Sequence, residues 1–385
     1  MATTKKRGGG TWRPLLGPFP RGLDRAAEVA MTDVLRVKKG ERVVIVTNPE
    51  KDVLTISAAL DEAATARGAE ATLLVQPRRT PVDLASDAVI HALRSQPEVI
   101  LSISADKLGK DRFGLEKPYR FKGHRGSWEH IFQALLGAGK SRAFWSPSVT
   151  VDTFARTVAV DYGEMRRRAR RLARALDAAE WTRITAPGGT ELEIGLQGRK
   201  ARLDDGSFHR PGTGGNLPAG ETYISPDNYT AEGVIVFDGS LALADGTGAF
   251  VPRRPVTVTV EEGLVTAVKG GAGAKRFEKS LAIGERTAEK MAGRPGWSKA
   301  RVDYYRRNAR HLGELGIGLN PAAKVTGNML EDEKILGTCH IAIGANYDDD
   351  AQAFTHLDCL VNRPTITVFY KGGRKRVIVA EGMPV

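Results

Sequence analysis

The sequence predicts a two-domain protein, with an α/β domain containing a mainly parallel sheet and then an α+β metal-binding domain with a largely antiparallel sheet. Over residues 20–150, short apolar β-branched runs alternate with amphipathic helical segments, which is typical of parallel strands covered by helices. From residue 181 the runs shorten and are separated by Asp-Gly and Gly-Gly pairs, which favour hairpin turns. Residues 313–358 place carboxylates and imidazoles between short apolar runs, as a divalent-metal site requires.

The composition indicates a folded, cytoplasmic protein. Hydrophobic residues make up 41% and charged residues 26%, so the chain can form sizeable cores. No run approaches the roughly 18 apolar residues of a membrane span, and the N-terminus lacks the apolar segment of a secretory signal. Cys339 and Cys359 both lie in apolar runs, which excludes a disulfide framework and indicates a reducing compartment. We expect no membrane association.

Four regions are expected: a flexible N-terminal tail (1–19), the α/β domain (20–150), a linking helix (151–180) and the α+β domain (181–385). The α/β pattern predicts helices over 22–37, 52–67, 82–93 and 131–136, and strands over 41–47, 71–75, 99–103 and 143–145. Asp52 is the expected N-cap of the second helix. Residues 105–128 are polar and contain glycine, as do segments that line a site or a partner surface.

The second domain is expected to contain short strands and two helices. Strands are predicted over 183–185, 191–194, 234–237, 256–260 and 264–268, and helices over 274–292 and 299–313. Three further apolar runs, 315–319, 339–344 and 358–361, are short enough to be strands. Glu314 is therefore expected at a helix end, directly before a glycine-broken strand.

The net charge of +12 raises the question of a nucleic-acid partner. The densest basic run, residues 165–174, has apolar residues at helical spacing and arginines on the other face. A solvated helix face explains this pattern, and no zinc finger or RNA-binding signature accompanies it. Nucleic acid is therefore the weaker interpretation. No dinucleotide-binding glycine motif follows the first strand and no P-loop motif occurs, so a nucleotide is not expected either.

Two of the seven histidines, His340 and His356, lie in strand-like runs near the C-terminal end. A single histidine in such a run is more often a hydrogen-bonded core residue. The pair favours metal, because His356 and Asp358 are two residues apart and so share one face of a strand. Oxygen and neutral nitrogen ligands suit zinc, cobalt or manganese, and no thiolate cluster accompanies them.

Several motifs, in the same order along the chain, resemble those of the aminopeptidase T-type metallopeptidases. They are Gly215–Glu221, Leu312–Asn320, Glu333-Lys334, Gly337–Gly344 and His356–Asp358. The resemblance extends from about residue 20 to the C-terminus. It implies a cytoplasmic, homodimeric metallo-aminopeptidase, a hydrolase that uses two metal ions to remove N-terminal residues from peptide substrates.

The resemblance also implies a metal-ligand set on matching positions. The residues are Glu221, Glu314, His340, Tyr347, His356 and Asp358. Three carboxylates would offset the repulsion between two close dications, either zinc, cobalt or manganese. A water molecule that bridges the ions would be acidified and become the nucleophile.

Two residues are candidates for catalysis. Tyr347, beside the metals, would stabilise the oxyanion of the tetrahedral intermediate. Glu333 is the candidate general base, because hydrolysis needs a carboxylate near the bound water but outside the metal shell. The alternative for Glu333 is a position on a helix surface. The three aspartates 348–350 are expected in a solvated loop.

Two spacings depart from the family, since His340 to His356 is shorter, at 16 residues, and Glu221 to Glu314 is longer, at 93 residues. The substrate therefore does not transfer, and two alternatives stay open. The same scaffold supports a mononuclear iron(II) ring-cleaving dioxygenase for dihydroxypyridines, for which His340, His356 and Asp358 would form a 2-His-1-carboxylate triad. Retention of Glu221 and Glu314 favours two ions and hydrolysis instead. The second alternative is a specialised peptide-binding or tailoring protein, against which the intact ligand set argues.

Overall fold

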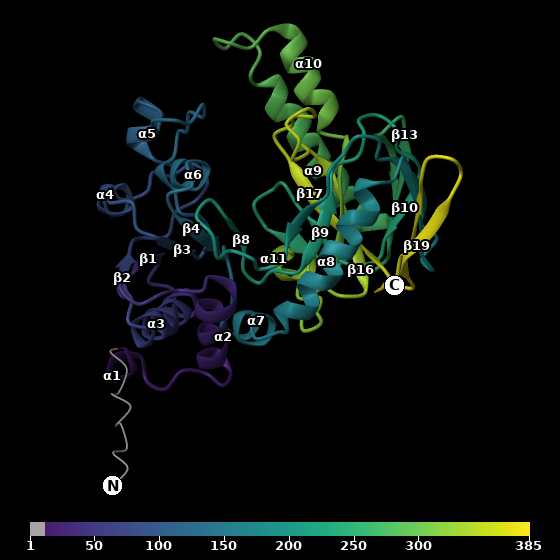
Figure 1. Ribbon diagram of the computed structural model, residues 1–385. Helices are drawn as coiled ribbons and strands as arrows, with labels where there is room; N and C mark the ends of the chain where they lie inside the picture. Colours follow the sequence, from purple (N-terminus) through teal and green to yellow (C-terminus); the bar gives the residue numbers. More distant parts are fainter. Residues whose placement is uncertain (1–11) are drawn as a thin grey trace. The chain divides into compact units, whose positions relative to one another are not determined.

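The computed structural model describes residues 12–385, and the chain folds into two compact units (Figure 1). The N-terminal unit comprises the chain up to Tyr162 together with Gly206–Ala219. The C-terminal unit comprises Gly163–Asp205 and Gly220–Val385. Most of the predicted N-terminal tail, residues 1–11, lies outside the described residues. The rest of it includes a short helix, α1 (Arg13–Leu16), and Trp12 next to it donates its indole N–H to Asp61 at 2.8 Å.

The N-terminal unit contains a five-stranded, fully parallel sheet in the order β2-β1-β3-β4-β8, which confirms the predicted α/β fold. Its first four strands are β1 (Arg42–Thr47), β2 (Glu70–Val75), β3 (Val99–Ile103) and β4 (Arg142–Trp145). The connections between them contain α3 (Lys51–Ala66), α4 (Asp87–Arg94) and α6 (Ile131–Gly137), while α2 (Leu23–Val29) precedes β1 and α7 (Val151–Thr157) follows β4. β3 is buried along its whole length, as expected for a continuous apolar strand between two helical layers.

The fifth strand, β8 (Gly214–Asn216), comes from a later part of the chain. It pairs in parallel with β4, and Phe144 lies opposite Gly215. A Cβ on Gly214 would lie 2.7 Å from the Ala143 carbonyl oxygen, so the close approach of these strands requires glycine. Glycine-rich sequence has little strand propensity, and the pattern analysis for this reason predicts no strand here.

Three details of the N-terminal unit differ from the sequence-based expectations. The helix expected over 22–37 changes from α2 into one π-helical turn, η1 (Ala30–Val34). The helix expected from residue 82 begins only at Asp87. α3 has Glu50 at its N-cap, without a side-chain hydrogen bond, so Asp52 lies in the first turn instead of capping it. There its negative charge still interacts favourably with the helix dipole.

The C-terminal unit contains two antiparallel sheets, which confirms and refines the prediction of a largely antiparallel domain. The eight-stranded sheet has the order β14-β13-β10-β6-β5-β18-β19-β20. Its strands are β5 (Trp181–Thr185), β6 (Glu191–Gly195), β10 (Glu232–Phe237), β13 (Val256–Glu261), β14 (Leu264–Lys269), β18 (Thr365–Phe369), β19 (Lys375–Ala380) and β20 (Met383–Pro384). The helices of this unit are α8 (Tyr162–Asp177), whose first residue belongs to the other unit, α9 (Gly271–Glu289), α10 (Lys299–Asn308) and α11 (Met329–Asp332).

The seven-stranded sheet has the order β12-β11-β17-β16-β15-β9-β7. Its strands are β7 (Arg202–Asp204), β9 (Glu221–Ile224), β11 (Leu241–Ala242), β12 (Ala249–Phe250), β15 (Leu312–Gly318), β16 (Thr338–Gly344) and β17 (His356–Asn362). Every residue of β15 and β16 is buried, so these two strands form the centre of the sheet's core. The three apolar runs predicted near the C-terminal end are therefore strands, and they are neighbours.

Glu314 lies inside β15, so the expectation that it follows a helix end is wrong. α10 ends at Asn308, and a hydrogen-bonded turn through His311 separates it from the strand. A Cβ on Gly313 would collide with the carbonyl oxygen of Ala345, so the strand needs glycine at this point. The glycines that break the apolar pattern thus allow close packing and do not delay the start of the strand.

The basic segment folds as the amphipathic helix α8. Its apolar residues are buried at helical spacing: Met165, Ala169, Leu172, Ala173 and Leu176. On the exposed side, Glu164 forms ion pairs with Arg167 and Arg168. The arginines are thus part of a solvated helix face. In the part of the chain that the structure describes, no helix is long and apolar enough to cross a membrane.

Arg142 provides a test of the N-terminal unit. Its guanidinium is only 4% exposed, lies 2.6 Å from the Glu41 carboxylate and donates to the carbonyl of Leu35. Arg142→Met leaves that carboxylate without its cation, so we expect the free energy of unfolding to fall by about 3 kcal/mol. Denaturant titration measures this change. The exposed Arg120→Met should change it by less than about 0.5 kcal/mol, and equal effects of both variants would contradict the assignment.

Candidate metal centre

Four adjacent strands of the seven-stranded sheet bring the five predicted His, Asp and Glu ligands together. Glu221 begins β9, Glu314 lies in β15, His340 in β16, and His356 and Asp358 in β17. The cross-strand register pairs Gly318 with Glu221 and Gly316 with His340. On the other side of β16, Ala342 lies opposite Asp358 and Gly344 opposite His356. The antiparallel register therefore places these side chains close in space although up to 137 residues separate them in sequence.

The ligand atoms form two groups that could each hold a metal ion, and Glu314 belongs to both. Glu221, Glu314 and His340 form the first group, in which His340 Nε2 lies 3.2 Å from Glu314 Oε1 and 3.4 Å from Glu221 Oε2. Glu314, His356 and Asp358 form the second, in which His356 Nε2 lies 3.4 Å from Glu314 Oε2 and 3.2 Å from Asp358 Oδ1. Both imidazoles thus point Nε2 at the same carboxylate.

The side chains fit a metal ion by their chemistry. Three carboxylate oxygens, Glu221 Oε2, Glu314 Oε2 and Asp358 Oδ1, are buried without a hydrogen-bond partner among the described residues. Leaving so many acceptors unsatisfied is costly unless a cation binds them. The Nδ1–H of His356 donates to the Ala345 carbonyl at 2.8 Å, which orients the ring as in metal-ligating histidines. The structure therefore supports a metal ion at this centre.

The pKa shifts of the clustered carboxylates and imidazoles also indicate that the centre favours positive charge. Burial opposes ionisation of Glu314, but the hydrogen-bonded His340 and the nearby imidazole of His356 hold its pKa below the usual value. Burial likewise opposes the charge of Asp358, but the neighbouring His356 lowers its pKa. Although burial alone would lower it, the pKa of His340 is raised to about 9 by Glu314 and Glu221. The space between these groups therefore attracts a cation.

Lys334 is also part of the centre, and the sequence analysis does not predict that its charge lies there. Its ammonium is 1% exposed and lies 2.5 Å from Glu221 Oε1, 2.7 Å from Glu333 Oε1 and 3.2 Å from Asp204 Oδ2. Although burial alone would lower it, the pKa of Lys334 is raised well above its usual value by these carboxylates. The available signal was its position directly after Glu333, within a motif already singled out.

Glu333 lies beside the centre, so the alternative of a helix-surface position is wrong. Its neighbours Glu331, Asp332 and Lys334 are fully buried, and its own side chain is 15% exposed. Burial raises the pKa of Glu333, and the nearby Asp358 adds to this effect. The catalytic role of Glu333 is still a prediction.

Tyr347 lies next to the predicted ligands and is 46% exposed. Its ring centroid lies 5.0 Å from that of His356 and 5.4 Å from that of Tyr223. Partial burial and the nearby Glu314 raise the pKa of Tyr347, so the phenol stays protonated. Its role as a ligand or an oxyanion donor is still a prediction.

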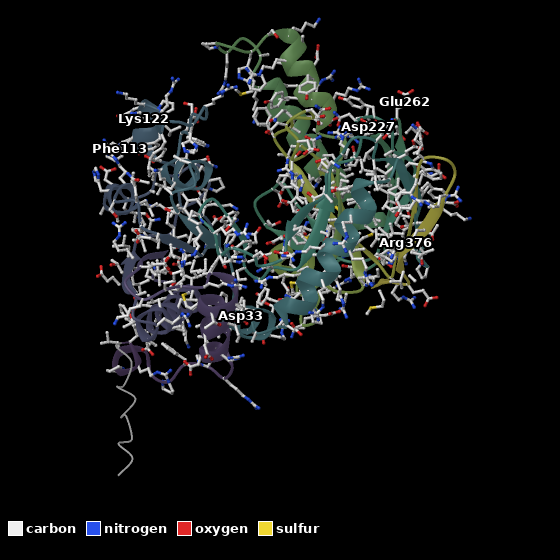
Figure 2. All side chains as sticks on the ribbon, in the orientation of Figure 1. Asp33, Phe113, Lys122, Asp227, Glu262 and Arg376 are labelled. Atoms are coloured by element: carbon white, nitrogen blue, oxygen red, sulfur yellow. The ribbon has the colours of Figure 1, made fainter. Side chains whose placement is uncertain are left out.

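The loop after Tyr347 is tied down, not simply solvated. Arg199, only 10% exposed, lies 2.8 Å from Asp350, 3.3 Å from Asp348 and 3.7 Å from Asp227, which is labelled in Figure 2. Arg202 donates to the Tyr347 carbonyl at 2.6 Å. The short connection between His340 and His356 is therefore held in place by arginines, and Tyr347 is held with it.

A protein-family comparison identifies the relationship. The family model described as NicX: 2,5-dihydroxypyridine 5,6-dioxygenase matches residues 148–359, which is more than half of the chain. The chain belongs to this family. The NicX match includes every residue of the predicted metal centre, from Glu221 to Asp358. Among curated proteins, none matches the chain.

Two solved structures share the fold. A 2,5-dihydroxypyridine dioxygenase from Pseudomonas putida KT2440 is 17% identical, with a TM-score of 0.67 over 94% of this chain and 96% of that one. Wild-type AmpT from Thermus thermophilus is 18% identical, with a TM-score of 0.64 over 96% of this chain and 100% of that one. At such identities the likeness establishes the fold alone. The predicted resemblance to aminopeptidase T-type proteins thus holds for the fold.

The expectation of a metallo-aminopeptidase, and with it the hydrolase and metalloprotease classes, is wrong. The NicX family model describes a dioxygenase, which is an oxidoreductase. The physical reason for the error is that glutamates, an aspartate and histidines can hold one ion or two and suit several metals, so the donor types do not determine the reaction. The fold does not determine it either, since both solved structures share it with this chain.

Gly316 provides a test of the centre. A Cβ at this position would collide with the ring of His340 across the strand pair. Gly316→Ala is therefore expected to weaken metal binding by at least about tenfold, as changes beside metal ligands commonly do. Competition with a chromophoric chelator measures the affinity. Ile317→Val, the next residue on the strand, should lower stability by about 1 kcal/mol and leave the affinity unchanged. Unchanged affinity in Gly316→Ala would refute the constraint.

Proposed function

We propose that this protein is an iron(II)-dependent dioxygenase that opens the ring of a dihydroxylated pyridine. The observation that carries the proposal is the convergence of two imidazoles and a carboxylate on one buried centre, within a chain of the NicX family. Two histidines and one carboxylate with open positions are the donor set of non-haem iron(II) oxygenases. His340, His356 and Asp358 would hold the ion, with Glu314 between the two imidazoles.

Charge supports one ion over two. A second dication would need Glu221 as a ligand, but Lys334 already lies 2.5 Å from that carboxylate. The ammonium also lies near Glu333 and Asp204, so it supplies the positive charge that a second ion would otherwise bring.

Bound iron(II) would supply the activation of dioxygen, both of whose atoms enter the ring-opened product. The protein's own residues would bind and orient the ring. The ring of Tyr347 next to His356, and the ring of Tyr223 next to Tyr347, offer apolar faces to a planar substrate. The protonated Tyr347 hydroxyl can donate a hydrogen bond to a substrate oxygen. Glu333, whose pKa burial raises, would accept the proton of a ring hydroxyl.

Metal content tests the number of ions. We expect one iron per chain after anaerobic reconstitution of the wild type, measured by plasma mass spectrometry after gel filtration. Glu221→Gln should retain this ion, because Glu221 pairs with Lys334, whereas His356→Ala should lose it. Two ions in the wild type that fall to one in Glu221→Gln would show that Lys334 does not replace a metal.

Oxygen consumption tests the activity. Iron-loaded protein is expected to take up one dioxygen per 2,5-dihydroxypyridine consumed, measured with an oxygen electrode and mass analysis of the product. Asp358→Ala should lower the rate by at least about 100-fold, since even changes outside the ligand shell cost up to that much. His91→Ala, an exposed histidine on α4, is the matched control and should be unaffected. Absence of oxygen uptake with any dihydroxylated pyridine would refute the function.

A further inference from the structure

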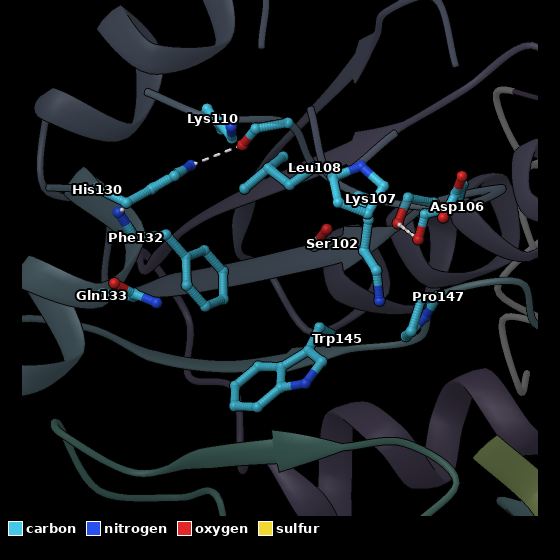
Figure 3. A pocket seen from close by; sticks show the side chains of 13 residues that line it. Ser102, Asp106, Lys107, Leu108, Lys110, His130, Phe132, Gln133, Trp145 and Pro147 are labelled. Carbon is cyan, nitrogen blue, oxygen red and sulfur yellow. Dashed lines mark hydrogen bonds between the residues drawn. The ribbon is translucent and has the colours of Figure 1, made fainter. Parts of the chain in front are cut away.

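The N-terminal unit contains a pocket of about 330 Å³ that the proposed function does not use. It lies at the carboxyl ends of β3 and β4, and Figure 3 shows Ser102, Lys107, Leu108, Phe132, Trp145 and Pro147 around it. All the residues that line it belong to the N-terminal unit. In open parallel sheets, ligands bind outside the carboxyl ends of the strands. The volume suits one small organic molecule.

The walls of the pocket suit a flat ring. The rings of Phe132 and Trp145 meet edge to face, with centroids 5.8 Å apart and planes inclined at 77°. Leu108 and Pro147 add further apolar surface (Figure 3). Aromatic side chains in this arrangement favour another aromatic ring, through both apolar contact and edge-to-face geometry.

Three polar groups that line the pocket are donors without partners. Among the described residues, no hydrogen bond or ion pair engages the Ser102 hydroxyl, the Lys107 ammonium or the Trp145 indole N–H. Figure 3 shows the Lys107 side chain extending between Trp145 and Pro147. Ser102 is itself only 5% exposed, so water satisfies its hydroxyl poorly. A ligand that supplies acceptors would satisfy all three groups.

The charge of the lining is positive. The lining contains two lysines, Lys107 and Lys110, and one carboxylate, Asp106. The charge of Asp106 is offset by Arg78, which lies 3.8 Å away. His130 adds no charge, because burial lowers its pKa and both ring nitrogens have partners, the Gly109 carbonyl and the Phe132 N–H. An anion is therefore the complementary ligand.

The loop that carries Lys107 is held in place by buried amides. Asn48, 1% exposed, accepts from the Ala105 N–H at 2.8 Å. Gln76, 2% exposed, donates to the Leu108 carbonyl at 2.8 Å. The Lys107 N–H donates to the Arg79 carbonyl at 2.9 Å. The pocket is thus pre-formed, which lowers the ordering cost of binding a ligand.

We propose that this pocket binds a small planar aromatic carboxylate. The ring lies against Trp145 and Phe132, and the carboxylate accepts hydrogen bonds from Lys107 and Ser102. The site needs no metal and does not depend on the proposed oxidation, since none of the predicted metal ligands lines it.

Isothermal titration calorimetry with benzoate, on the full chain treated with chelator, tests the site. We expect one benzoate per chain. Benzyl alcohol, which lacks the charge, and cyclohexanecarboxylate, which lacks the aromatic ring, should bind at least about tenfold more weakly. Lys107→Met should weaken benzoate binding by about tenfold or more, the usual effect of losing a hydrogen bond to a charged group. Lys122→Met, an exposed lysine of the same unit labelled in Figure 2, is the control and should bind as the wild type does.

Ser102→Ala and Asp358→Ala complete the design. Ser102→Ala is a small change that should weaken binding several-fold without unfolding the sheet, checked by near-ultraviolet circular dichroism. Asp358→Ala should bind benzoate unchanged, even though it loses the metal centre. No benzoate binding by the wild type, or equal binding by Lys107→Met, would overturn the proposal. Loss of binding in Asp358→Ala alone would also overturn it, because benzoate would then report on the metal centre.

Discussion

Buried negative charge is the constraint on which the C-terminal unit depends. Five carboxylates lie together with little or no exposure: Asp204, Glu221, Glu314, Glu333 and Asp358. Carboxylates so placed repel one another and lose their hydration, so they persist only where cations compensate. One cation is built in, as Lys334, and the imidazoles of His340 and His356 face the remaining carboxylates. The antiparallel strands hold these groups at fixed spacing, so the carboxylates cannot move apart. The sheet is therefore stable only when cations balance their charge.

The relation between fold and activity in this chain illustrates how little a scaffold restricts chemistry. Similar folds occur in a dihydroxypyridine dioxygenase and in AmpT, each with less than one fifth of residues identical to this chain. What distinguishes the possible reactions is local: how many carboxylates are available to a metal, and how many are already neutralised by the protein. Lys334 bears on both numbers, because its ammonium lies beside three of the buried carboxylates and so reduces the negative charge that remains there.

Much of the architecture could be predicted, because strands buried on both faces are β-branched and continuous, and helices show their apolar spacing. The cluster of candidate ligands could be predicted because His356 and Asp358 share one face of a strand and His340 interrupts an apolar run. The role of Lys334 as a buried cation could not be predicted. A lysine that follows acidic residues has the same sequence pattern on a surface as in a buried cluster. The arginines that hold the loop after Tyr347 could not be predicted either, because Arg199 pairs with Asp350 across 151 residues of sequence. The reaction was misjudged for a chemical reason: oxygen and imidazole donors do not by themselves determine the number of ions.

The origin of β8 has a consequence for how the protein can be divided. Residues 206–219 return to the N-terminal unit and place β8 beside β4. The Ser146 hydroxyl donates to the Leu217 carbonyl, which anchors the same segment. A fragment that ends at Tyr162 would therefore expose the unpaired edge of β4, with open backbone donors and acceptors, and such edges recruit other strands. The polypeptide joins its two units through three crossings instead of one, so neither unit is a continuous piece of sequence that a protease or a truncation could release intact.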